Sequence, residues 1–330
     1  MSVKQKDIIF HGSASMPDSD TPTEIGGAID KSIKVTWAPM DTTDEVEVVS
    51  ESASDTSQNV TVYGRNAAGE LVNEQIDLTG QTPAAGLIAF ERLLKAVKSA
   101  ICAGTVAVMH TVNETSGTAQ GGGTDYITLA AGASAVDNAY QFMVIRITGG
   151  TGINQIREVV EYNGTTKQAD VRDWSTGPDA TSVYEIAVGM VMDKSPNEID
   201  ECRRPFYDVA ADPPGGIDKD YYDKIFVYNQ HPTLALTNAK IDEVVEGGYA
   251  KVEFALESSL DGLGTNGAGN NRQVAPSAGI GPFNSNVKDV ANSGNFSPES
   301  GQGLWLHLDL AAGDAADNTY YKLKVSGQST

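Results

Sequence analysis

Short segments in which apolar and polar residues alternate recur along most of this chain. In Lys31–Trp37 (KSIKVTW) the residues Ile33, Val35 and Trp37 fall on one side, which is the period of a half-buried β-strand. Glycine is abundant, at 34 residues, and serves the turns that such strands need. We therefore predict a mainly β protein of two or three antiparallel β-sandwich or barrel units, the last of them immunoglobulin-like, with long irregular loops.

One β-hairpin can be read directly from the sequence. Asn59–Arg65 (NVTVYGR) and Glu70–Leu78 (ELVNEQIDL) both alternate, and they enclose the four-residue turn Asn66–Gly69. Phe90–Ala100 fits either a short helix or a strand, and its β surroundings favour the strand. The inward residues expected for the hairpin are Val60, Val62, Val72, Ile76 and Leu78.

Glycine-rich and proline-rich segments suggest four parts. We expect an N-terminal β domain with an extended arm (1–112), an inserted small barrel or sandwich (113–189), a connector (190–223) and a C-terminal immunoglobulin-like sandwich (224–330). Within the last part, the Gly-, Asn- and Ser-rich stretch 258–300 exceeds the usual loop length, which makes it a candidate partner-binding arm.

The C-terminal region carries a second strand pattern. Gly303–Leu310 alternates, with Leu304, Leu306, Leu308 and Leu310 on one face, and Tyr320–Ser326 follows after a turn. The pattern predicts a strand–turn–strand hairpin that closes the last sandwich.

Charge excludes several classes of partner. Asp and Glu total 44 against 23 Lys and Arg, so the formal net charge is −21, which disfavours binding to nucleic acid or to anionic membranes. No stretch approaches the about 20 apolar residues of a membrane span, and the N-terminus lacks the apolar core of a signal peptide. Cys102 and Cys202 are too isolated for a disulfide framework or zinc site, so we expect a protein made in a reducing cytoplasm.

No motif of catalysis is recognisable. The four histidines are scattered, there is no GxSxG or GxxxxGK[ST] motif, and Gly149–Gly152 precedes a strand, where a phosphate loop would open a helix. We predict no enzyme activity, no catalytic residues, and no cofactor-binding or metal-binding residues. For two acidic groups, solvated turn residues and a weak cation site both stay open; these are Asp18 with Asp20, and Asp309 with Asp314 and Asp317.

Three segments resemble structural proteins of tailed bacteriophages. The run FMVIRITGGTGINQIREVVEYNGTTKQADVRDWSTGPDATSVYEI looks like a module that recurs in such proteins. NVTVYGRNAAGELVNEQIDLTGQTP is similar to hairpins of phage head and tail components, and KIFVYNQHPTLALTNAKI with GQGLWLHLDLAAGDAADNTYYKLKVSGQ is similar to their C-terminal units.

The resemblance implies a non-enzymatic virion protein, assembled in the host cytoplasm. It implies a head decoration or cement protein that binds copies of itself, as a homotrimer, and the major capsid protein. A neck, tail or fibre component that touches a host receptor or glycan is the alternative, and an enzyme or carbohydrate-binding protein is a third. Copy number in the particle distinguishes the first two.

Overall fold

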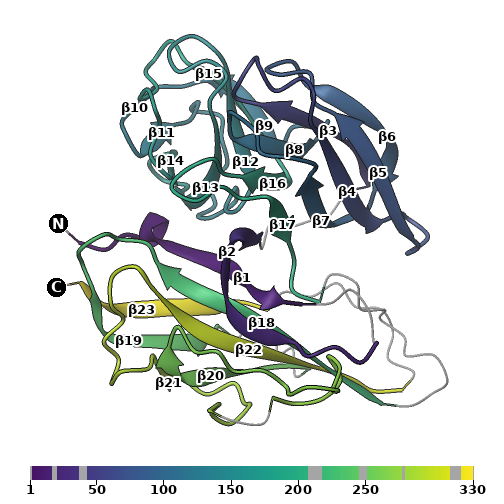
Figure 1. The fold of residues 1–330 in the computed structure, drawn as a ribbon. Helices are drawn as coiled ribbons and strands as arrows, with labels where there is room; N and C mark the ends of the chain where they lie inside the picture. The colour runs from purple at the N-terminus through teal and green to yellow at the C-terminus, as the bar shows by residue number, and fades with distance from the viewer. Residues whose placement is uncertain are drawn as a thin grey trace. The chain divides into compact units, whose positions relative to one another are not determined.

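The computed structural model describes residues 2–16, 21–36, 43–206, 218–244, 251–276, 279–312 and 321–329. β-Strands dominate these residues, and their one helical element is the 3-10 turn η1 (Gln5–Asp7), which confirms the mainly β prediction. The chain forms two compact units: Met1–Lys31 with Pro205–Thr330, and Ser32–Arg204 (Figure 1).

Both ends of the chain build the larger sheet of the first unit. Its order is β20-β22-β18-β1-β2, and Figure 1 shows the purple N-terminal β1 beside the green β18. All the pairings among the first four strands are antiparallel, as in an ordinary meander or sandwich sheet. The bounds are β1 (Ile8–Ser15), β2 (Gly26–Val35), β18 (Lys219–Asn229), β20 (Val252–Leu260) and β22 (Ser300–Leu310).

A smaller sheet completes this unit, in the order β21 (Lys288–Asp289), β19 (Leu236–Glu243) and β23 (Leu323–Ser329). β23 pairs with β19, whereas β22 pairs with β18 and β20. The predicted closing hairpin is therefore wrong, because its two strands belong to different sheets. Local alternation identified both strands but carries no information about which partner each one chooses.

The long stretch between β20 and β22 is irregular, as predicted, but its described part is anchored to the unit. Asn266 is buried and accepts a hydrogen bond from the Ile25 backbone N–H at 2.8 Å. Phe296 is fully buried and bridges Leu236, and Ile280 bridges Glu257. Its role as a partner-binding arm stays a prediction, but this part of it is not a freely extended arm.

Two layers of four strands form the sandwich of the second unit. One layer runs β16-β8-β3-β6 and the other β17-β7-β4-β5, with the end of β2 parallel to β17. β4 and β5 form the predicted hairpin around Asn66–Gly69, and Phe90–Ala100 is mostly strand. The bounds are β3 (Asp44–Ser50), β4 (Asn59–Arg65), β5 (Leu71–Asp77), β6 (Ala84–Phe90), β7 (Arg92–Lys98), β8 (Val106–His110), β16 (Gly189–Met192) and β17 (Glu201–Arg203).

A seven-stranded lobe emerges between β8 and β16, in the order β10-β11-β14-β13-β12-β15-β9. Its two edge strands are consecutive in the chain, so the sheet curls round until its ends approach one another. β8 and β16, which flank the lobe, pair with each other, as expected for an insertion. The bounds are β9 (Thr115–Thr118), β10 (Gly121–Gly122), β11 (Tyr126–Thr128), β12 (Val144–Gly149), β13 (Ile156–Asn163), β14 (Gln168–Val171) and β15 (Val183–Ala187).

The two units divide the chain differently from the four expected parts. Residues 1–31 belong with the C-terminal strands, and the lobe shares one unit with the sandwich that carries it. The expected connector 190–223 contains most of β16, all of β17 and the start of β18, and its residues 207–217 lie outside the described residues. These differences arise because strands far apart in the chain pair with each other. The local composition of a segment does not indicate such pairings.

Candidate functional site

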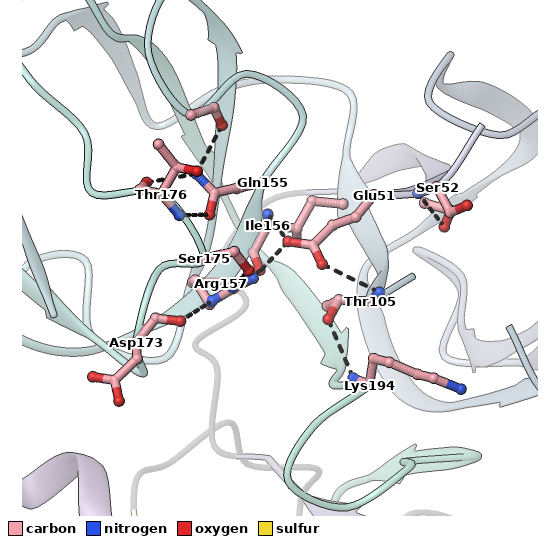
Figure 2. Close-up of polar contacts among 12 residues, drawn as sticks. Glu51, Ser52, Thr105, Gln155, Ile156, Arg157, Asp173, Ser175, Thr176 and Lys194 are labelled. Carbon is pink, nitrogen blue, oxygen red and sulfur yellow. Dashed lines mark hydrogen bonds and ion pairs between the residues drawn. The ribbon is translucent and has the colours of Figure 1, made fainter. Parts of the chain in front are cut away.

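A glutamate at the end of β3 joins three parts of the second unit (Figure 2). Oε1 of Glu51 accepts hydrogen bonds from the Ile156 backbone N–H at 2.8 Å and from the Arg157 guanidinium at 2.5 Å. Its other oxygen accepts a bond from the Thr105 backbone N–H at 3.4 Å. Thr105 also accepts a bond from the Lys194 backbone N–H at 3.2 Å. One carboxylate thereby fastens the start of β13, in the lobe, to the sandwich.

The same arginine holds a loop of the lobe. Nε of Arg157 donates to the Asp173 carbonyl oxygen at 2.9 Å, and the guanidinium lies 5.5 Å from the Trp174 ring. Beside it, the Gln155 side-chain amide donates to the Thr176 carbonyl at 2.8 Å and accepts from its backbone N–H at 2.9 Å (Figure 2). These bonds leave Arg157 engaged on both sides, as a charged group inside a protein requires.

A second ionic group is centred on Lys34 of β2, whose side chain is only 2% exposed. Its Nζ lies 2.8 Å from Glu158 and 3.0 Å from Asp193, and donates to the Val191 carbonyl oxygen at 3.2 Å. The Arg172 guanidinium lies 3.6 Å from Glu158 and 3.8 Å from Asp193. Two cations and two carboxylates from four separate segments thus share one buried cluster, which we call the Lys34 cluster.

Pairing overrides burial in the Lys34 cluster. Burial alone would lower the pKa of Lys34, but the charges of Asp193 and Glu158 raise it above its ordinary value. Burial alone would raise the pKa of Asp193, but Lys34 and Arg172 hold it below the ordinary value. Both groups are charged at neutral pH. At the neighbouring Cys202 burial dominates instead, and it raises the pKa of the thiol to about 12.

The first unit contains a comparable cation, Lys224 of β18, whose side chain is 0% exposed. Its Nζ lies 2.7 Å from Glu257 and donates to three carbonyl oxygens, those of Gly27 at 2.7 Å, Gly262 at 3.0 Å and Gly264 at 3.1 Å. Burial lowers the pKa of Lys224, against the opposing effect of Glu257. The three N–H groups of this ammonium are shared among four oxygen acceptors, which tie the 262–264 segment to the sheet.

The four histidines lie in different settings. His11 and His110 are buried in β1 and β8. Nδ1 of His231 accepts bonds from the Thr233 and Leu234 backbone N–H groups. His307 lies between an exposed carboxylate and the aromatic rings of the first unit, at 2.7 Å from Asp220 and stacked on Tyr222 at 4.8 Å between centroids.

No metal site is visible in the part of the chain that the structure describes. Its His, Cys, Asp and Glu side chains form no group of three that could hold an ion. Asp309 is exposed on β22, whereas Asp18, Asp20, Asp314 and Asp317 lie outside the described residues. The absence of catalytic and cofactor-binding residues stays a prediction.

The sequence did not reveal the ionic groups. Alternation placed Ile33 and Val35 inward and hence Lys34 outward, yet Lys34 is buried, because β2 is covered on both faces there. Its partners lie 124 and 159 residues away, at Glu158 and Asp193, so no short motif links them. Nothing in the sequence distinguishes Lys34 from the other polar residues of this alternating segment, such as Lys31 and Ser32.

Comparison with known proteins finds no matching family model, no matching curated protein and no matching solved structure. Among the described helices, none has the length and apolar character needed to cross a membrane.

Proposed function

We propose that this chain is a non-enzymatic structural protein of a tailed-phage particle that decorates or cements the outer surface of the head. The resemblance of three of its segments to phage structural proteins supports this proposal. The observation that carries the proposal is that buried cations hold the fold together. Lys34, Arg157 and Lys224 each bind groups from several separate segments, which suits a rigid scaffold.

The proposed partners are further copies of this chain, as a homotrimer, and the major capsid protein. An acidic outer surface fits a protein on the outside of a DNA-filled shell, because it is not attracted to the phosphate backbone. Repeated copies on a symmetric shell would make attachment multivalent, so each single contact can be modest. The alternative is a neck, tail or fibre component, for which exposed loops of the lobe would offer the contact surface.

The test is the amount and place of the protein in purified particles of the phage that encodes it. Quantitative mass spectrometry against the major shell protein gives the ratio, and an imaged particle gives the position. A ratio fixed by shell symmetry, with density on the head, supports decoration. A ratio typical of one ring or one fibre set supports the alternative. Absence of the chain from complete particles refutes both.

A further inference from the structure

Strand β6 of the second unit exposes a leucine to solvent at a β-bulge. Leu87 is 86% exposed, the highest value among the exposed large apolar side chains of the described residues. Glu45 pairs with Ala89 and Glu47 with Ala85, so three residues of β6 stand opposite the single residue Val46 of β3. Bulges of this kind at sheet edges re-aim side chains.

A carboxylate from β5 fixes the bulge. Both oxygens of Glu74 accept hydrogen bonds from the Leu87 backbone N–H, at 2.8 and 3.0 Å, and one also accepts from the Ile88 N–H at 3.0 Å. Gly86 leaves room for this approach, because a Cβ there would lie 2.5 Å from Oε2 of Glu74. The carboxylate occupies the N–H donors of Leu87 and Ile88, so at the bulge this edge presents a side chain and not a regular row of free backbone donors.

Small apolar residues and carboxylates surround Leu87. Ala85 and Ala89 are also exposed. Gly86, which lies between them in the strand, and Phe90, at its end, are buried. We call the exposed residues Ala85, Leu87 and Ala89 the ledge. Directly opposed residues of an antiparallel pair project to the same face, so Glu45 and Glu47 lie beside the ledge.

Among the described residues, no Lys or Arg side chain forms an ion pair with Glu45 or Glu47. Burial and the charge of Glu185 raise the pKa of Glu47, and Arg146 only partly offsets them. That arginine is already engaged, at 3.2 Å from Glu185 and by a bond to the Gln81 carbonyl oxygen at 3.1 Å. A positive group from outside would relieve the repulsion between Glu47 and Glu185.

We propose that Leu87, with Ala85 and Ala89, is the anchor by which this chain inserts into an apolar pocket with a Lys- or Arg-lined rim on another protein. The inference rests on the proposed function, in which that protein is the shell subunit. Charge favours this occupant over a second copy of the chain. A second copy docked by the same surface would bring its own Glu45 and Glu47 against the first pair, and like charges that meet in an interface are unfavourable.

The experiment measures binding of the purified full chain to particles from which it is absent or has been stripped. We expect Leu87→Ala to weaken binding about tenfold, the effect of losing most of one buried leucine side chain. Glu74→Ala keeps the leucine but frees the bulge, so it should weaken binding by a smaller factor. Leu71→Ala is the matched control, since Leu71 is 58% exposed on β5 in the other layer, and it should bind like the unmodified chain. Unchanged thermal unfolding establishes that each variant is folded.

The outcomes separate the two proposals. If the unmodified chain does not bind the particles, the proposed function fails. If it binds and Leu87→Ala binds equally well, the function stands and the anchor is refuted. Sedimentation without particles tests the other occupant: an oligomer that Leu87→Ala dissociates would assign the ledge to a second copy and overturn the proposal. Glu45→Gln with Glu47→Gln should reduce the salt sensitivity of binding, and an unchanged salt dependence would refute the basic rim.

Discussion

Replacing Lys34 with methionine tests whether the Lys34 cluster braces the second unit. The change keeps the length and apolar stem of the side chain but removes the ammonium that lies 2.8 Å from Glu158 and 3.0 Å from Asp193. Removing one partner of a buried ion pair costs about 3–5 kcal/mol, because a buried charge is left uncompensated. Arg172 remains within 4 Å of both carboxylates, so we expect the lower end, about 3 kcal/mol.

Hydrogen exchange measured by mass spectrometry is the appropriate assay, because two units can unfold separately and a single global transition would mix them. Peptides from β13 and β16, which carry or adjoin the carboxylates, should exchange faster in Lys34→Met. Lys240→Met is the control, since the Lys240–Asp289 pair at 3.2 Å is exposed and should contribute less than about 1 kcal/mol. Combining Lys34→Met with Asp193→Asn, which leaves Glu158 as the counterion of Arg172, should recover part of the loss. A Lys34→Met effect no larger than that of Lys240→Met would refute the reasoning.

Three further predictions follow from the same geometry. The lowered pKa of Asp193 means that its stabilising contribution is present above about pH 4 and is lost as pH falls through the folded-state pKa, so acid should accelerate exchange in β16 less in Lys34→Met than in the unmodified chain. Burial raises the pKa of Cys102 to about 11 and of Cys202 to about 12, so iodoacetamide at pH 8 should label neither thiol in the folded chain and both in urea; labelling of the folded chain would contradict their burial. Gly150→Ala should cost about 1–3 kcal/mol by thermal unfolding, because φ is +71° and the added Cβ would lie 2.0 Å from the Thr181 carbonyl oxygen, whereas Gly132→Ala, in open space, should change little.

Features encoded within a few residues were predictable from the sequence. The β4–β5 hairpin follows from two alternating runs and a turn that ends in Gly69. Its two strands are neighbours in the chain, so local pattern and final structure agree.

Pairings between distant segments were not predictable in the same way. β1 pairs with β18, more than 200 residues away, and this placed residues 1–31 in the C-terminal unit. The Lys34 cluster has the same origin, since its four members come from segments that are far apart in the chain. The anchor proposed on β6 was also missed, because AAGLIAF shows no alternation of apolar and polar residues, and neither the bulge nor the contact with Glu74 is encoded within the segment.

The placement of cations bears on what this acidic chain can bind. Among the described residues, seven Lys or Arg side chains are buried, against five Asp or Glu, although the whole chain has 44 acids and only 23 cations. A larger share of the chain's positive side chains than of its negative ones is therefore buried. The solvent-facing surface is accordingly more acidic than the composition alone implies, and among the described residues the exposed Glu45 and the half-buried Glu47 beside Leu87 form no ion pair with a cation. A partner binds this surface most favourably when it supplies the missing positive charge. The chemistry of β6 therefore favours a protein with a basic rim around its pocket over a second acidic copy of this chain.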